Sequence, residues 1–304
     1  MKLDEFVETK FWPYCSKLRE STVVGYESAY RCHVYPKFGE WELESIGVED
    51  IELWLASFEK SGAARKAYAV LRCMLRKAFK WQHCKFDPTV LQVDLPYHPR
   101  YRPDILDDKD LAMLLKGLYG TDIETVVLCS VTLGLRRCES CGIKWKDIDL
   151  RNGAVFINKG KHYVKGKVKI EPCKTDLSNR IVYLPKFALI RMRELAKGHD
   201  KEEWICDLSP DAVSRKYKAA CKRLGLSYVP MKNLRHSYAT SQLRAGIDTS
   251  VLSQMLGHYD VRTTERYYLV PDAQLYKTAQ SQWESRFLKN ANVSVDTIIH
   301  EEAA

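Results

Sequence analysis

The chain has 304 residues, which is enough for two ordinary domains that each bury a hydrophobic core. Lysine and arginine outnumber aspartate and glutamate by 48 to 39, and the resulting net charge of +9 favours a polyanionic partner. The sequence has no apolar run of about 18 residues and no signal peptide, which argues against membrane and secreted proteins. Its ten cysteines are irregularly spaced, as in proteins that keep their thiols reduced, so we expect a cytoplasmic protein.

Residues 1–94 are predicted to form a helical domain. Apolar side chains recur at helical spacing from Val23 to Val34, which indicates one amphipathic helix. Proline cannot continue a helix freely and glycine is common just after one, so Pro36 with Gly39 is expected to end it.

Two more helices of this domain are expected, at 48–59 and 64–83. The second of them has apolar side chains on one side and a run of basic side chains on the other. A solvated face is the simplest interpretation of such a run, and contact with phosphates is the alternative. The basic residues are Arg65, Lys66, Arg72, Arg76, Lys77 and Lys80.

A linker is predicted at 95–104. Its sequence LPYHPRYRP has three prolines in nine residues and neither helical nor strand periodicity. Such a segment is extended and semi-rigid, and it marks a domain boundary. The second domain is therefore expected over 105–288, followed by a polar C-terminal tail at 289–304.

The second domain is predicted to combine helices with a small sheet. Its strand segments are short and rich in Val, Ile and Tyr, and its helical segments show the longer period. We expect strands at 154–157, 163–171 and 180–184, and helices at 107–119, 123–133, 209–224, 233–245 and 248–256, followed by a short helix and a final long one. The expected fold is thus mainly α, of the α+β kind, with one small antiparallel three-stranded sheet.

The helix expected at 209–224 is basic. It begins with a Ser-Pro pair, which suits an N-cap and a first-turn proline. Its basic side chains could lie in a major groove or in solvent. They are Arg215, Lys216, Lys218 and Lys222.

No cofactor or metal is expected from the sequence. Cys138 and Cys141 form a lone Cys-x-x-Cys pair inside a predicted helix, and a zinc site would need a second pair of ligands. Only Cys173 and His162 lie near enough in sequence, so packed thiols are the better interpretation. A glycine-rich phosphate loop and clustered carboxylates are also missing from the sequence.

The stretch from Met231 to Leu269 carries the residue types of a phosphate-transfer site. Arg235, His258 and a pair of tyrosines fall on successive short segments that glycines separate. If these segments converge, they bring a charge-stabilised phosphate site next to a phenolic nucleophile.

The strings in this stretch resemble those of the tyrosine recombinase (phage integrase) family. They are LRHSYAT, then LGH, then a tyrosine nine or ten residues after that histidine. Upstream, TLGLRRCESCGIKWKDIDL is similar to the first arginine box of the family. The resemblance extends by motif over about Asp104 to Phe287, and its strength lies in the four elements occurring in the right order.

The resemblance implies roles for five residues outside the tyrosine pair. Arg136 and Arg235 would donate to the two non-bridging phosphate oxygens, with Glu139 in support. His258 would donate to the same phosphate or tune the tyrosine. Lys174, in the turn KTDLSN, would protonate the departing 5′-oxygen.

The sequence departs from the family pattern at Lys232, where a histidine usually stands. A lysine is a fixed cation near neutral pH, so we interpret Lys232 as an additional phosphate donor rather than a proton relay. The nucleophile is Tyr267 or Tyr268, because the family uses both spacings. We prefer Tyr268, from the sequence that follows it, whereas the run TTERY favours Tyr267.

The resemblance implies a site-specific recombinase, an integrase of a mobile element or phage, that cuts and rejoins DNA through a 3′-phosphotyrosyl link without metal. A type IB topoisomerase-like enzyme and a catalytically silent DNA-binding relative are the alternatives. The expected partner is double-stranded DNA at recombination sites, with a directionality factor possible, and in this setting phosphate contact by both basic helices is favoured. Because nothing before Lys2 can form the accessory arm-binding domain of many integrases, we expect either a two-domain recombinase or a shortened chain.

The final helix bears on self-association. Its apolar residues recur every fourth position, at Leu275, Ala279, Trp283 and Phe287. This stripe either packs inside its own domain or belongs to a C-terminal segment that is exchanged between the protomers of a tetramer, as the resemblance implies. Both interpretations remain open at the level of sequence.

Overall fold

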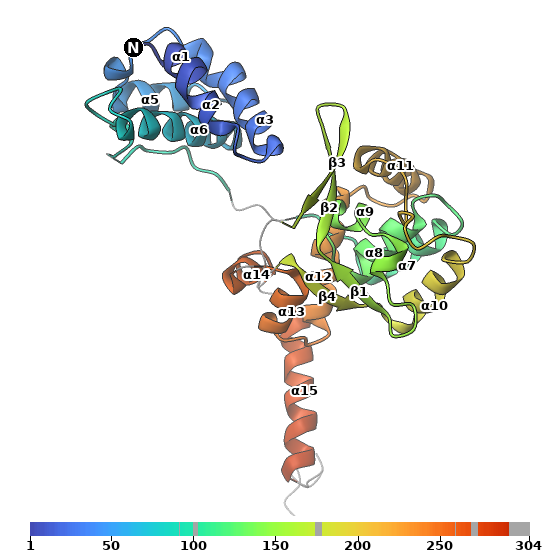
Figure 1. Ribbon diagram of the computed structural model, residues 1–304. Coiled ribbons are helices and arrows are strands. Elements are labelled where there is room, and N and C mark those ends of the chain that lie inside the picture. Colours follow the sequence, from blue (N-terminus) through green and yellow to red (C-terminus); the bar gives the residue numbers. More distant parts are fainter. Residues whose placement is uncertain (91, 100–102, 174–177, 259, 269–272, 292–304) are drawn as a thin grey trace, which may run out of the picture. The chain divides into compact units, whose positions relative to one another are not determined.

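The chain divides into two compact units, Met1–Tyr101 and Arg102–Ala304 (Figure 1). The computed structural model describes residues 1–90, 92–99, 103–173, 178–258, 260–268 and 273–291. Within the described residues, no helix is long and apolar enough to cross a membrane.

The described part of the first unit is helical apart from one β-bridge, between Lys2 and Glu42, and irregular segments. Its core combines aliphatic side chains with large aromatic ones, of which Phe6, Phe11, Tyr30 and Phe38 are all buried. Its α-helices are α1 (Leu3–Phe6), α2 (Trp12–Cys15), α3 (Glu20–Ala29), α4 (Tyr35–Phe38), α5 (Val48–Ala56) and α6 (Ser61–Lys80), with short 3-10 segments at Leu43–Ser45 and Pro88–Val90.

Two prolines of this unit lie within continuous helical segments. Pro13 follows a π-helical turn at Val7–Phe11, and Pro36 follows one at Tyr30–Val34. A proline has no N–H and its ring collides with the carbonyl four residues back, and a wider π turn relieves both problems. Pro36 therefore does not interrupt the helical segment, which ends at Phe38 with Gly39 as its C-cap, so the end predicted near Gly39 is confirmed.

The second unit is built around one fully buried helix. All ten residues of α8 (Glu124–Leu133) are buried, and they join a large apolar core that draws on most other elements of the unit. The remaining helices are α7 (Asp108–Gly117), α9 (Arg137–Cys141), α10 (Lys186–Leu195), α11 (Pro210–Arg223), α12 (Leu234–Arg244), α13 (Thr249–Leu256), α14 (Val261–Tyr268) and α15 (Ala273–Ala291), with 3-10 turns at Trp145–Asp147 and Met231–Asn233. Helix α10 is absent from the sequence-based prediction, and α15 runs three residues past position 288.

The strands form two separate antiparallel ladders. β1 (Ala154–Ile157) pairs with β4 (Arg180–Tyr183), and β2 (Lys159–Val164) pairs with β3 (Lys167–Pro172). The mainly α, α+β class is confirmed. The single three-stranded sheet is wrong, because the segment read as one strand folds back on itself.

The fold-back occurs at Lys165 and Gly166. Both residues have positive φ, 48° and 80°, and they form a two-residue connection between Val164 and Lys167. Consecutive positive φ values define the hairpin turn that matches the twist of paired strands, and glycine accepts such a φ without strain. The Lys-Gly pair was thus a turn signal inside an apparently continuous strand.

Candidate active site

The first arginine box lies at the start of α9, directly after the end of α8. Gly134 ends α8 in the left-handed conformation, with φ 61°, and a Cβ there would lie 2.3 Å from the Tyr238 ring. Arg136 is the N-cap of α9, and its backbone N–H donates to the carboxylate of Glu139 at 3.0 Å. Its Nη1 donates to the other oxygen of that carboxylate at 2.6 Å. Glu139 therefore caps the helix and orients the Arg136 guanidinium at once.

A second arginine, Arg180 at the start of β4, shares the same carboxylate. Its Nη2 donates to Glu139 at 2.9 Å, and its Nε donates to the carbonyl oxygen of Met255 at 2.7 Å. Burial alone would raise the pKa of Glu139, but Arg180, and after it Arg136 and Arg235, hold the pKa at about 2. The carboxylate therefore stays charged although only 4% of its residue surface is exposed.

The second arginine box places Arg235 in the first turn of α12. The residue is 6% exposed, and its guanidinium donates to the carbonyl oxygens of Gly134 at 3.0 Å and Leu256 at 2.7 Å. These two carbonyls lie at the C-terminal ends of α8 and α13, where a cation is favoured. One buried arginine thus holds two helix ends together at the site.

His258 directly follows the left-handed Gly257 that ends α13. Its backbone N–H donates to the carbonyl oxygen of Ser253 at 3.0 Å, in the pattern of a helix-ending motif. Its ring Nδ1 lies 2.8 Å from the hydroxyl oxygen of Thr264, a fully buried residue of α14. Gly257 also leaves room for Arg180, since a Cβ at position 257 would lie 3.0 Å from that guanidinium.

The imidazole of His258 is neutral near pH 7. Burial, followed by the charges of Arg235, Arg136 and Arg180, lowers its pKa to about 3. A neutral imidazole has one N–H donor and one acceptor nitrogen. The ring can therefore donate one hydrogen bond to a bound anion, but it adds no charge.

The cluster as a whole is cationic. Three guanidinium groups, those of Arg136, Arg180 and Arg235, face one carboxylate, that of Glu139, so two positive charges remain. A phosphodiester carries one negative charge and gains a second as a nucleophile adds to phosphorus. Fixed cationic donors in a buried site stabilise such developing charge most strongly.

The profile of the Phage integrase family matches residues 109–274, and the profile of the phage integrase N-terminal SAM-like domain matches residues 3–58. The chain belongs to the phage integrase family. Tyrosine recombinase XerA of Saccharolobus solfataricus is 27% identical over 237 residues, which cover 74% of this chain and 75% of that protein.

Solved structures share the fold at lower sequence identity. One shows the Tn1549 transposon integrase in complex with a circular intermediate DNA, with a TM-score of 0.75 and 16% identity over 94% of this chain and 99% of that one. Another shows a lambda integrase tetramer bound to a Holliday junction, with a TM-score of 0.62 and 17% identity over 91% of this chain and 77% of that one.

The structure brings together four of the residues that the phage integrase motifs single out, namely Arg136, Glu139, Arg235 and His258. Lys232 lies one turn before Arg235 on the 3-10 segment, with its side chain exposed. The predictions for Lys174 and for the side chains of the two tyrosines fall outside the described residues, although α14 places the tyrosine backbones in its last turn.

Two polar residues of the cluster were missed in the sequence. Arg180 stands in the string KTDLSNRIVYLP that points to Lys174, and the sequence pattern predicts only that it begins a strand. Thr264 stands in the run TTERY beside the tyrosines. In both cases the signal was a polar residue inside a family motif to which no role had been given.

The basic face of α6 divides into two groups. Arg65 Nε donates to the carbonyl oxygen of Pro96 at 3.0 Å, and Lys77 Nζ donates to the hydroxyl of Tyr14 at 3.0 Å. Both side chains are thus engaged within their own unit. Lys66, Arg72, Arg76 and Lys80 are exposed.

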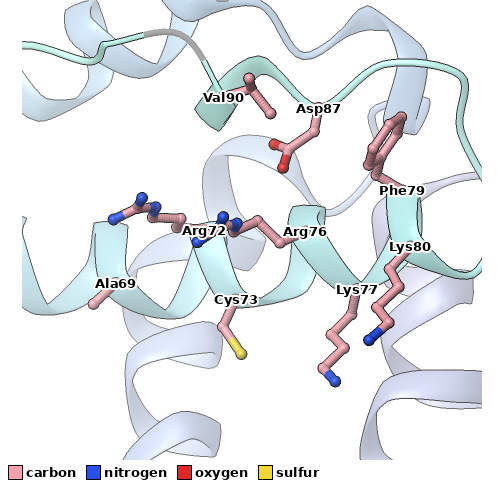
Figure 2. Close-up of a pocket in the computed structure, with 9 residues that line it drawn as sticks. All are labelled: Ala69, Arg72, Cys73, Arg76, Lys77, Phe79, Lys80, Asp87 and Val90. Atoms are coloured by element: carbon pink, nitrogen blue, oxygen red, sulfur yellow. The ribbon is translucent and has the colours of Figure 1, made fainter.

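A groove of about 600 Å³ runs along this face of α6 (Figure 2). Figure 2 shows Arg72 and Arg76 on the same side of the helix, with the carboxylate of Asp87 pointing toward them. That carboxylate accepts hydrogen bonds from the backbone and hydroxyl of Thr89. The groove therefore presents arginines over a fixed, buried acid, with Lys80 further along.

Helix α11 carries a second basic groove, of about 510 Å³. Arg215, Lys218 and Lys222 line it together with Tyr228, and Lys218 lies 5.4 Å from the centre of the Tyr228 ring. Lys216 faces elsewhere and pairs with the carboxylate of Asp122. The N-cap at Ser209 accepts a hydrogen bond from the Ala212 backbone, which confirms the predicted start of this helix.

The Cys-x-x-Cys pair lies on α9 as expected. Cys141 is buried and Cys138 is partly buried, and burial raises the pKa of both thiols, that of Cys141 to about 12. Thiols of this kind are poor nucleophiles and poor metal ligands. Among the described residues, no three His, Cys, Asp or Glu side chains are grouped so that they could hold a metal ion.

Proposed function

We propose that this chain is a site-specific DNA recombinase that cuts and rejoins DNA through a 3′-phosphotyrosyl intermediate. The observation that carries the proposal is the cluster in which the partly exposed Arg136 and the buried Arg235 lie around the buried Glu139 beside the neutral ring of His258. A phosphodiester seated there meets forked donors that match two non-bridging oxygens.

In the proposed reaction, the phenolic oxygen of a tyrosine attacks the phosphorus atom of the scissile phosphodiester. The bond between phosphorus and the 5′-oxygen breaks, and the protein becomes linked to the 3′ end. The proton of the tyrosine passes to water, and a separate proton joins the 5′-oxygen as it leaves. The energy of the broken phosphodiester bond is kept in the phosphotyrosyl link. On rejoining, a 5′-hydroxyl of a second strand attacks this link, forms a new phosphodiester bond and releases the tyrosine.

We assign the attack to Tyr268, with Tyr267 as the competing residue. Both stand in the last turn of α14, three and four residues after Thr264. Because neighbouring helical residues point about 100° apart, only one hydroxyl can face the phosphate. We further propose that Lys174 protonates the 5′-oxygen and that Lys232 adds a donor to the phosphate.

We propose that both units bind the same double-stranded DNA. The exposed part of the basic face of α6 and the groove on α11 supply cationic side chains for the backbone, and phosphate contacts of this kind set affinity and register rather than sequence. We also propose an accessory directionality factor as a further partner of the chain.

We also propose that the chain acts as a tetramer on DNA and exchanges its C-terminal segment between protomers. The lambda integrase tetramer on a Holliday junction supports the tetramer by fold likeness. Within α15, Trp283 is 57% exposed and Phe287 44%, and their rings stack with centroids 5.1 Å apart. Of the two interpretations of this stripe, exposure favours an interface at these positions. The side chains of Leu275 and Ala279 fall outside the described residues.

The test is to trap the covalent adduct on a nicked suicide substrate. The wild-type chain and Tyr267→Phe should form it, and Tyr268→Phe should not. An adduct that persists in Tyr268→Phe and vanishes in Tyr267→Phe would reverse the assignment, and an adduct in both would overturn the mechanism. Lys174→Ala should recover cleavage on DNA whose 5′-bridging oxygen is replaced by sulfur, because a thiolate leaves without a proton.

A type IB topoisomerase uses the same chemistry and is not favoured, because the chain belongs to the phage integrase family and its relative XerA is a recombinase. A two-site assay separates the two activities. A recombinase exchanges strands between two DNA sites, whereas a topoisomerase relaxes supercoils without a second site. A catalytically silent relative would bind DNA and form no adduct at all.

A further inference from the structure

We propose that Thr264 is a positioning residue that fixes His258 in the tautomer with the proton on Nε2, so that His258 acts as a hydrogen-bond donor to the phosphate. The inference rests on the proposed function and concerns the same site. It also makes the donor dependent on the seating of α14, the helix that carries the nucleophile.

Hydrogen bonds of the main chain fix the backbone of His258, so a separate contact is needed to fix the orientation and tautomer of its ring. The left-handed Gly257 and the hydrogen bond from the His258 N–H to Ser253 hold the main chain at the end of α13. The contact between Nδ1 and the Thr264 hydroxyl, at 2.8 Å, then holds the ring. A second partner that sets the tautomer is the usual arrangement for a functional histidine.

The direction of this hydrogen bond follows from counting protons. A threonine hydroxyl has one proton, and within the described residues the ring of His258 is the hydrogen-bonding partner of the Thr264 hydroxyl. Thr264 is 0% exposed, so no solvent can accept that proton. If Nδ1 carried the ring proton, the hydroxyl would be a buried donor without an acceptor, which native proteins avoid. Thr264 therefore donates to Nδ1.

The ring proton of the neutral imidazole must then sit on Nε2. In this form the ring can donate through Nε2, and it has no free lone pair with which to accept the proton of the attacking tyrosine. His258 thus completes the donor set of Arg136 and Arg235 rather than acting as a general base.

The location of Thr264 ties this arrangement to the nucleophile. Thr264 lies on α14, one helical turn before the two tyrosines, and residues three and four positions apart share a side of a helix. Helix α14 packs against α12 and α13, and this packing places the Thr264 hydroxyl on the His258 ring. The same packing therefore positions both the donor and the helix that carries the nucleophile.

The first experiment reads the tautomer in the full chain without reference to activity. Nitrogen-15 NMR of histidine-labelled protein at pH 7, with the His258 signals assigned from their loss in His258→Gln, should show a protonated Nε2 and an unprotonated Nδ1 in the wild type. Thr264→Val keeps the branched shape but removes the hydroxyl, and it should lose this single pattern. A protonated Nδ1 in the wild type, or an unchanged pattern in Thr264→Val, would overturn the proposal.

The second experiment measures single-turnover cleavage of the nicked suicide substrate. Thr264→Val should slow cleavage by about 10- to 100-fold with unchanged DNA binding, as expected for loss of a supporting partner, and Thr264→Ser, which keeps the hydroxyl, should recover most of the rate. In a His258→Ala background, Thr264→Val should have no further effect. Equal slowing in both backgrounds would mean that Thr264 acts through packing alone. Failure of the wild type to form an adduct would instead remove the proposed function and leave the NMR result standing.

Discussion

Arginines serve two regions of this molecule in opposite ways. At the arginine cluster around Glu139, Arg235 is buried and both of its described hydrogen bonds go to backbone carbonyls, and Arg180 is held by Glu139 and by the main chain. On α6, Arg72 and Arg76 are exposed along an open groove. The first group cannot move without disturbing two helix ends, whereas the second can adjust to what it binds.

The difference follows from what each region has to do. Charge that develops during a reaction is stabilised best by donors that are already oriented in a dry site. Affinity for a long polyanion comes from many exposed cations, each displacing a counterion. Substitutions in the two regions should therefore separate cleavage from binding.

The largest effect is expected for Arg136→Ala. Removing one fixed donor to the phosphate should slow cleavage by about 10³-fold, while DNA binding stays within about tenfold because other contacts carry affinity. Single-turnover cleavage and equilibrium binding to the same DNA measure the two quantities. Parallel loss of both would show that Arg136 is structural. Arg235→Ala should differ by also lowering the thermal midpoint, since Arg235 joins two helix ends.

Glu139→Gln should lower the free energy of unfolding by about 3 kcal/mol at pH 7. The pKa of the Glu139 carboxyl falls from 4.5 to about 2 on folding, and each pKa unit corresponds to about 1.4 kcal/mol. Because the folded pKa is depressed, this stability is fully present above pH 4.5 and is lost as the pH falls toward 2. The gap between wild type and variant in urea unfolding should close over that window. Glu202→Gln, at an exposed ion pair, is the matched control and should show no such closure.

The double variant Arg72→Ala/Arg76→Ala should weaken DNA binding at least about tenfold with cleavage at saturating protein unchanged. If the wild type neutralises about eight phosphates, the slope of log K against log salt is about −7, and losing two contacts should make it shallower by about 2. Lys77→Gln is the control, because Lys77 is engaged with Tyr14, and it should leave the slope unaltered. A wild-type slope shallower than about −2 would remove the idea that both units contact the duplex.

The smallest effect is expected within α11. Lys218→Ala should reduce the salt slope by about 1, because Lys218 lines the open groove. Lys216→Ala should leave the slope nearly unchanged, because Lys216 pairs with Asp122. DNA-binding titrations of both variants at several salt concentrations measure the two slopes. An equal reduction in both would mean that the Asp122 pair opens when DNA binds.

The sequence by itself determined which residue types enter the site and in which order along the chain. Arg136, Arg235 and His258 were found from short strings, and their helix ends followed from local signals such as Gly134, Gly257 and the Ser-Pro start of α11. These features depend on neighbours a few residues away, because caps and left-handed glycines are set by the local backbone. The hairpin at Lys165 and Gly166 was equally local and was overlooked.

Only the tertiary structure decided which partner each charge has. Glu139 and Arg180 are 41 residues apart, and Arg235 reaches the carbonyl oxygen of Gly134 across 101 residues. The same holds for Lys77. The helical pattern makes it equivalent to Lys80, but in the structure it donates a hydrogen bond to the hydroxyl of Tyr14. Periodicity fixes the face on which a side chain lies, but hydrogen bonds form over about 3 Å, and that proximity comes from packing between distant segments.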